Sequence, residues 1–373
     1  MNDRKAKRSR SRRRNGFVDI LNGLLSLLVL GLLVGGGILL YGISQFYGDG
    51  PGKEDTTFRV ETGSGLAATA ERLENQGLIG NRFVFQMGGR ALERQGNIKA
   101  GDFRIPAGAS MADILKELTE GNPIRYAVTI PEGWTSWEVI QRLNADGNLI
   151  GEVSALPAEG SILPGSYDYV PGATRQSVLD AMQTAMATEL ATIWENRAPD
   201  LPLKSPEELV VLASVVEKET GLASERPQVA AVFVNRLKQS MRLQSDPTII
   251  YGITKGQSTL GRGLRRSEIE EKTAYNTYQI DGLPPTPIAN PGIESLRAVA
   301  NPDTHNYLYF VAKGATPDQG HVFAETYAEH QKNVARYREI AREAAQQAEA
   351  DAEAARQAIE AAEATEAGDA PAQ

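Results

Sequence analysis

Two glutamates stand two residues apart at the end of an apolar run, where acid–base chemistry is possible. The segment 209–220 reads LVVLASVVEKET, so Glu217 and Glu219 follow directly after its apolar part. A carboxyl group at the edge of an apolar surface is poorly hydrated, which raises its pKa and lets it hold a proton near neutral pH. A general acid needs this property. The alternative is that both glutamates are solvated residues where a buried helix reaches the surface.

Helical geometry limits what this pair can do. Side chains two residues apart project about 200° apart around a helix axis. Glu217 and Glu219 therefore cannot both face one scissile bond, and at most one of them is catalytic. They lie on opposite flanks of the stripe formed by Leu209, Leu212, Ala213 and Val216. Periodicity does not choose between the two. For Glu219 we expect a pairing with Lys218 or Arg226.

Further motifs follow at characteristic separations, namely VEKE at 216–219, LQSDPT at 243–248, AYNTY at 274–278 and GLPPTPI at 282–288, followed by Asn290-Pro291-Gly292, Tyr307-Leu308-Tyr309-Phe310-Val311 and His321-Val322-Phe323. In this order they resemble the endolytic murein transglycosylase family, the MltG or YceG-like proteins. The resemblance covers most of residues 58–338 and is densest between 211 and 323. It is a joint signal, because no single motif is diagnostic.

The resemblance implies a lytic cleavage of the β-1,4 bond between MurNAc and GlcNAc in nascent peptidoglycan. In this reaction the 6-hydroxyl of MurNAc attacks its own anomeric carbon and leaves a 1,6-anhydro end. Because the nucleophile is intramolecular, no second carboxylate is needed to activate water. One glutamate can protonate the leaving oxygen and then accept the hydroxyl proton. The family resemblance assigns this role to Glu217.

A segment dense in Tyr, Pro, Asn and Gly, residues 242–290, is typical of a functional loop region on a rigid scaffold. Within it we expect five side chains to line a glycan cleft: Ser245, Asp246, Tyr275, Asn276 and Tyr278. The alternative is structural: the tyrosines belong to the core, and Asp246 caps a turn before Pro247.

Composition excludes several other chemistries. The 373 residues contain no cysteine, which removes disulfides, thiol catalysis and cysteine metal sites. The three histidines (His305, His321 and His330) form no HExxH pair, so we expect no metal and no cofactor. No serine lies in an SxxK or GxSxG motif, which argues against a serine peptidase or transpeptidase.

The N-terminal region predicts a membrane anchor. The first fourteen residues carry a net charge of +7, although the whole chain is at −8. Residues 20–47 follow without a charged side chain and are long enough to cross a bilayer. The positive-inside rule places the basic arm, residues 1–19, in the cytoplasm and the rest of the chain outside. We therefore expect a single-pass protein of the inner (cytoplasmic) membrane with a periplasmic or otherwise extracytoplasmic enzyme, and no nucleic acid partner.

The remaining chain predicts an α+β organisation. A Gly/Pro/acid linker at 48–57 leads to a module at 58–122 with a strand at 58–60, a helix at 65–75, a strand at 102–105 and a helix capped by Ser110. The family resemblance implies a LysM-like fold for this module. The transglycosylase domain then covers 123–340, with a strand at 125–130, a capping box at Thr135–Glu138, a loop at 151–175 and helices at 178–194, 206–219 and 227–238. The Ala/Glu-rich residues 341–373 form a solvated helix or a disordered tail.

One function from another class fits the same features up to residue 122. A non-catalytic peptidoglycan-binding or division-scaffold membrane protein would also combine an anchor with a glycan-binding module. It differs in predicting that Glu217→Gln keeps full activity in cells. Glycan strands are the expected partner in either case, and peptidoglycan synthases are a further expected partner.

Overall fold

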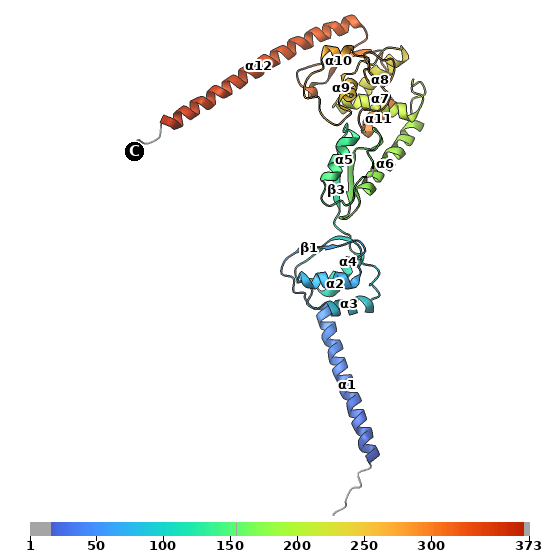
Figure 1. Cartoon of the computed structure of the whole chain (residues 1–373), viewed down its shortest axis with the longest axis vertical. Helices are drawn as coiled ribbons and strands as arrows, with labels where there is room; N and C mark the ends of the chain where they lie inside the picture. Colours follow the sequence, from blue (N-terminus) through green and yellow to red (C-terminus); the bar gives the residue numbers. More distant parts are fainter. Residues whose placement is uncertain (1–15, 154, 369–373) are drawn as a thin grey trace, which may run out of the picture. The chain divides into compact units, whose positions relative to one another are not determined.

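A computed structural model of the chain describes residues 16–153 and 155–368 (Figure 1). Residues 1–15 of the predicted basic arm and 369–373 of the tail lie outside the described residues. The chain divides into two compact units, one made of residues 1–125 and 170–172 and the other of 126–169 and 173–373. The elements mix helices with short two-stranded antiparallel sheets.

The first unit joins a long apolar helix to a small α/β module. Its elements are α1 (Gly16–Tyr47), β1 (Thr56–Val60), α2 (Leu66–Asn75), α3 (Arg82–Ala91), β2 (Gly101–Ile105) and α4 (Met111–Glu120). Strands β1 and β2 pair antiparallel, with Phe58 opposite Phe103, and both rings are fully buried. The helix α1 contains a predominantly apolar span of 28 residues, 20–47, that is long enough to cross a membrane.

Helix α3 is absent from the sequence prediction. Asn81 caps it by accepting hydrogen bonds from the backbone N–H groups of Phe83 and Val84, at 2.8 and 3.1 Å. The pair Gly88-Gly89 lowers the helix propensity of the segment, so residue propensities alone do not predict a helix here. Gly89 packs against Leu66 of α2, so tertiary contact supports a helix that its own sequence favours weakly.

The predicted linker at 48–57 is attached to the module. The N–H of Gly50 donates to the carbonyl of Gly108 at 3.1 Å, and the N–H of Gly108 donates to the carbonyl of Gly52 at 2.8 Å. Asp55 accepts from Arg104 at 2.8 Å. The end of α1 is therefore tied directly to the module.

The second unit holds the remaining elements: β3 (Tyr126–Ile130), α5 (Ser136–Ala145), β4 (Gly165–Tyr169), α6 (Arg175–Glu195), α7 (Pro206–Glu219), η1 (Ala223–Glu225), α8 (Arg226–Lys238), α9 (Asp246–Thr254), α10 (Arg266–Glu270), α11 (Ile293–Ala300), β5 (Tyr309–Ala312), η2 (Pro317–Gln319), β6 (His321–Ala324) and α12 (Tyr327–Gly368). Helices α6, α7, α8 and α11 pack on one another around the largest apolar cluster. A second cluster lies between β3, α5, β4 and the start of α6.

Two parts of this unit differ from the sequence prediction. The loop predicted at 151–175 contains β4, which pairs antiparallel with β3. Its sequence GSYDY has little strand propensity, so it becomes a strand because of its partner. The irregular region 242–290 contains the short helices α9 and α10.

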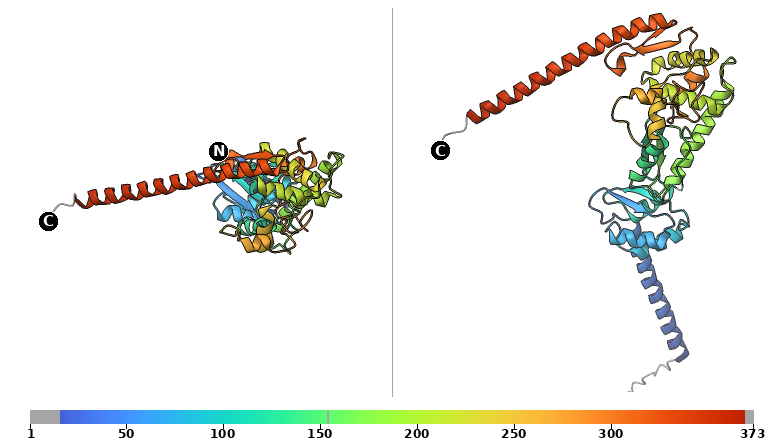
Figure 2. Two further views of the ribbon diagram at one scale, coloured as in Figure 1. Left: turned by 90° about the horizontal axis from the view of Figure 1, so that it is seen from above. Right: turned by 45° about the horizontal axis from the view of Figure 1, so that its top comes forward.

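The Ala/Glu-rich tail was predicted as a solvated helix or a disordered segment. Its residues 341–368 belong to α12, which Figure 2 shows as one long uninterrupted helix, so the structure has the helical form.

Candidate active site

Helix α7 is a rigid support for the two glutamates. Ser205 caps it by accepting from the N–H of Glu208, and Pro206 occupies its first turn, where a missing N–H costs nothing. All residues from Leu209 to Val216 are buried, so the helix is packed on every side before it reaches Glu217. A side chain at the end of such a helix has little freedom to move.

Glu217 is held at the N-terminus of α11. Its side chain is only 6% exposed. Its Oε2 accepts from the Ser295 hydroxyl at 2.6 Å and from the N–H of Gly292 at 3.0 Å. The N-terminal end of a helix favours a negative charge, because unpaired N–H groups converge there. Its Oε1 has a longer contact, 3.4 Å, to Nη2 of Arg226.

Arg226 links Glu217 to a second carboxylate. The same Nη2 donates to Oε2 of Glu132 at 2.8 Å, which is shorter than its contact with Glu217. Arg226 is 9% exposed on its side chain, whereas Glu132 is 42% exposed. Because both carboxylates contact one nitrogen atom, their nearest oxygens lie within about 6 Å of each other. Arg226 pairs with Glu217 and Glu132, so the expected pairing of Glu219 with Arg226 is wrong.

Asn290 connects the segments that carry these groups. Its buried side-chain amide donates to the carbonyl of Trp134, to the Ser136 hydroxyl and to Glu159, at 3.0 to 3.2 Å. The backbone carbonyl of Asn290 accepts from the N–H of Gly133 at 3.0 Å. This network fixes the 132–136 turn beside the 290–292 turn. Burial raises the pKa of Glu159 in this network.

Close packing at two glycines completes the site. A Cβ at Gly292 would overlap the carboxylate of Glu132. Gly133 has φ of +75°, and a Cβ there would lie 3.4 Å from Cγ of Glu217. Lys218 does not pair with Glu219 through a described contact; its ammonium donates to the carbonyl of Gly133 at 3.2 Å.

Glu219 lies in a different environment from Glu217. Its Oε1 accepts from the Ser245 hydroxyl at 2.5 Å. Burial, with a contribution from the charge of Asp246, raises the pKa of Glu219 to about 7. The two glutamates thus contact different segments, α11 and the start of α9, as their opposite helical flanks predict.

The other expected cleft residues gather near Glu219 and α10. Ser245 is buried, and Asp246 accepts from the Tyr278 hydroxyl at 2.7 Å. Burial and the charge of Asp246 raise the pKa of Tyr278. Asn276 is fully buried and donates to three backbone carbonyls, those of Glu268, Ile269 and Glu271.

Tyr275 is partly exposed and contacts three neighbouring side chains. Its hydroxyl bonds to Thr286 at 2.7 Å, and its ring lies 5.2 Å from that of Tyr251 and 4.4 Å from the ammonium of Lys255. Of the five expected residues, Asp246 is exposed and Tyr275 and Tyr278 are partly exposed, whereas Ser245 and Asn276 are enclosed by protein.

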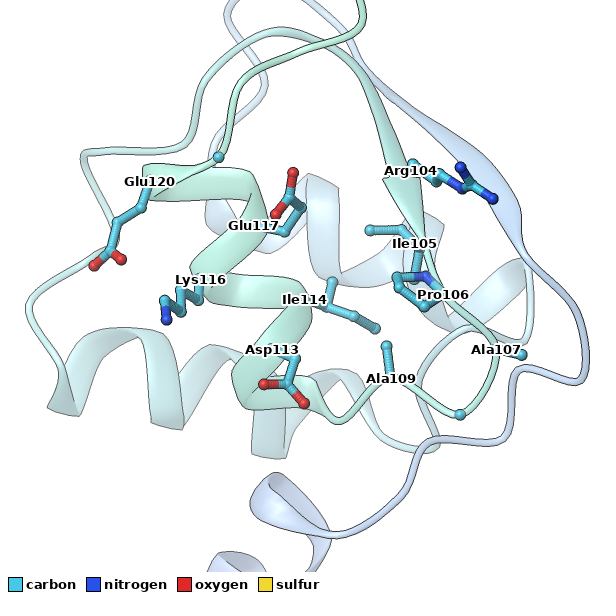
Figure 3. A pocket seen from close by; sticks show the side chains of 12 residues that line it. Arg104, Ile105, Pro106, Ala107, Ala109, Asp113, Ile114, Lys116, Glu117 and Glu120 are labelled. Carbon is cyan, nitrogen blue, oxygen red and sulfur yellow. The ribbon is translucent and has the colours of Figure 1, made fainter.

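Among residues 16–153 and 155–368, no group of three or more His, Asp or Glu side chains is placed to hold a metal ion. A cavity of about 710 Å³ lies in the first unit, along β2, α4 and their connection (Figure 3). Ile105, Pro106, Ala109 and Ile114 form its apolar part, and charged residues of α4 border it. It contains no residue of the glutamate site.

Sequence reasoning missed the residues that orient Glu217. Glu132 stands in the turn between β3 and the capping box, and Ser295 lies in the first turn of α11. Helical periodicity carries no information about either, because both contacts join distant segments. The motif Asn290-Pro291-Gly292 was the available signal, since it contributes the connecting amide and the N–H donor.

The chain is similar to known proteins of one family. The model of the YceG-like family matches residues 58–336. A Bacillus subtilis protein named endolytic murein transglycosylase is 27% identical over 343 residues, covering 82% of this chain and 91% of that protein. A Streptococcus pneumoniae protein of the same name is 27% identical over 338 residues, covering 78% of this chain and 59% of that protein. The crystal structure of a YceG-like protein from Listeria monocytogenes has 26% identity and a TM-score of 0.45, and it covers 75% of this chain and 99% of that chain. The resemblance read from the motifs is confirmed, and the chain belongs to the YceG-like family.

Proposed function

We propose that this chain is a membrane-anchored endolytic murein transglycosylase that cleaves the MurNAc–GlcNAc bond and leaves 1,6-anhydro-MurNAc ends in cell wall assembly. The names of the two curated relatives support the reaction class. The observation that carries the assignment is the position of Glu217. It is a nearly buried carboxylate fixed by a hydroxyl and an N–H at the start of α11.

Glu217 performs both proton transfers, and its two oxygens have different tasks. Oε2 is occupied by two short hydrogen bonds, so Oε1 carries the reacting proton. Oε1–H protonates the glycosidic oxygen, and the bond from the MurNAc anomeric carbon breaks with its electron pair going to that oxygen. The resulting carboxylate then accepts the proton of the 6-hydroxyl, whose oxygen bonds to the anomeric carbon. No water is consumed, and Glu217 ends in its starting protonation state.

Arg226 and Glu132 are positioning residues in this scheme. Glu132 holds Nη2 of Arg226 at 2.8 Å, while the contact of the same nitrogen with Oε1 of Glu217 is longer, at 3.4 Å. Arg226 therefore lies beside Glu217 without forming a short ion pair with it. The arrangement orients Glu217 and leaves its Oε1 without a short hydrogen bond.

The expected cleft residues contribute in two ways, by contacting the glycan and by holding the loops. Tyr275 offers a partly exposed ring for a sugar face, and Asp246 and Tyr278 offer polar groups at the start of α9. Asn276 and Ser245 contribute by holding the loops, since their polar atoms bond to protein.

The first unit anchors the enzyme and contacts its polymer. Helix α1 spans the inner membrane with the basic arm in the cytoplasm, which leaves the second unit outside. The module is LysM-like: the order β1, α2, α3, β2 with an antiparallel strand pair supports this assignment. Glycan strands are its ligand, and peptidoglycan synthases are the expected protein partners.

Digestion of purified sacculi tests the reaction. The detergent-solubilised full-length chain is incubated with sacculi, and the released muropeptides are identified by mass. We expect anhydro-MurNAc ends on fragments of several disaccharides, because cleavage occurs within strands. Reducing MurNAc ends, heavier by one water, would show hydrolysis and overturn the proposal. Absence of release by the wild-type chain, with binding to sacculi retained, would favour the non-catalytic alternative.

A further inference from the structure

An exposed apolar face lies on α3, beside the end of α1. Phe83 and Met87 are 64% and 70% exposed, and they are four residues apart on one side of the helix. Phe85 and Gly89 are buried in the module. Since residues two apart project about 200° apart, Phe83 and Met87 point away from the module core.

Helix α3 is fixed against the last turns of α1. The ring of Phe46 is 5% exposed and packs on Gly88, where a Cβ would overlap it. The side-chain amide of Gln45 lies near Gly80, which precedes α3. Packed helices are separated by roughly 8–10 Å between axes, so α3 stays close to the point where α1 leaves the bilayer.

The length of α1 places this point at headgroup depth. Its span of 28 uncharged residues is about 42 Å long at 1.5 Å per residue, more than the hydrocarbon core of about 30 Å. The end of α1 therefore reaches into the interfacial layer. Tyr47 stands there with its ring 61% exposed, as interfacial tyrosines do.

Basic side chains flank the apolar face. Arg82 lies over the Phe83 ring with its guanidinium carbon 5.1 Å from the centroid, and Arg90 is exposed at the other end of α3. Apolar groups bordered by arginines are the composition of a helix that lies in a membrane interface. Arg82 also pairs with Glu71 and Glu74, at 3.5 and 3.7 Å, so Arg90 is the arginine whose charge can reach the phosphates while its stem contacts lipid.

We propose that α3 docks on the outer surface of the membrane, with Phe83 and Met87 inserted among lipids. This inference rests on the proposed anchoring of the chain by α1. Its consequence is that the module has a fixed orientation at the bilayer and does not turn freely about the end of α1.

Single labelled cysteines test this docking, and the absence of native cysteine makes each label unique. Three variants of the full chain are prepared, Met87→Cys, Leu30→Cys and Thr62→Cys. Each carries an environment-sensitive fluorophore and is placed in nanodiscs with or without brominated lipids. Leu30 is an exposed residue of α1 and reports the anchor. Thr62 is an exposed residue of the same module and is the matched control.

We expect brominated lipids to remove about half or more of the emission at Met87 and Leu30 and to leave the emission at Thr62 unchanged. Quenching at Leu30 without quenching at Met87 would overturn the docking and leave the anchor intact. A blue-shifted Met87 label that lipids do not quench would mean that protein covers the face, and this also overturns it. No quenching at Leu30 would refute the anchor itself and the docking with it.

Discussion

The hydroxyl of Ser295 donates a hydrogen bond of 2.6 Å to Oε2 of Glu217, although the two residues are 78 positions apart in the chain. Together with the N–H of Gly292, this contact fixes one oxygen of the carboxylate, and the other oxygen is the one proposed to transfer the proton. A glutamate on a packed helix thus receives its orientation from a neighbouring helix N-terminus.

Glu217→Gln tests which glutamate transfers the proton. An amide preserves the shape of the side chain but cannot donate the required proton, so anhydro-muropeptide release should fall by at least about 10²-fold. Glu219→Gln is the matched control, two residues away on the same helix, and should lose much less activity. Release is measured by mass with thermal stability in parallel. The roles would be swapped if Glu219→Gln abolished release at unchanged stability while Glu217→Gln remained near normal.

Glu132→Gln should lower activity through Arg226. It removes the carboxylate that holds Nη2 of Arg226 at 2.8 Å and frees the guanidinium to move toward Glu217, which disturbs the orientation of that side chain. The rate of anhydro-muropeptide release should therefore fall by about tenfold or more, because small misplacements of a reacting group are costly. Glu294→Gln serves as the control, because its carboxylate lies on α11 but pairs with Arg297. Equal losses in both variants would argue against a specific role for Glu132.

The stability of the protein should depend on the ionisation of Glu219. Its pKa is raised from 4.5 to about 7 in the folded state. The stabilisation by the protonated form is complete below pH 4.5 and is lost as the pH rises through about 7. Relative to Glu219→Gln, the wild-type free energy of unfolding should fall by roughly 3 kcal/mol between pH 4.5 and 8. Denaturant unfolding at several pH values measures this, and parallel curves would refute the burial of this acid.

Reporter fusions test the predicted membrane topology. A reporter that is active only outside the cytoplasm should work when it is fused after residue 373, because the arginine-rich arm precedes the apolar span. A cytoplasm-only reporter at the same junction is the complementary control. Activity of that second reporter alone would reverse the assigned topology.

Capping motifs and hydrophobic runs predicted the elements that are determined by neighbouring residues. The cap at Ser205, the capping box at Thr135 and the apolar span of α1 follow from neighbouring residues, and the structure contains all three. Strand β4 and helix α3 were missed because they form through contacts with distant partners, β3 and α1 among them.

The residues of the candidate site also differ in whether neighbouring residues could predict them. Glu217 was predicted from its helix and the family motif. The ion pair of Arg226 with Glu132 spans 94 residues, and Asn290 reaches back 156 residues to Trp134. Pairings of this range leave no periodic signal in one sequence.

The range of these contacts also determines when activity can arise during synthesis. A nascent chain grows from its N-terminus, and a ribosome that has released residues up to about 220 has already exposed Glu132 and Glu217. The amide of Asn290, the N–H of Gly292 and the hydroxyl of Ser295 follow some 70 residues later. Until they emerge, Glu217 lacks the hydrogen bonds that fix its Oε2. Under the role proposed for Glu217, the nascent chain does not cleave glycan before residue 295 has emerged and packed beside α7.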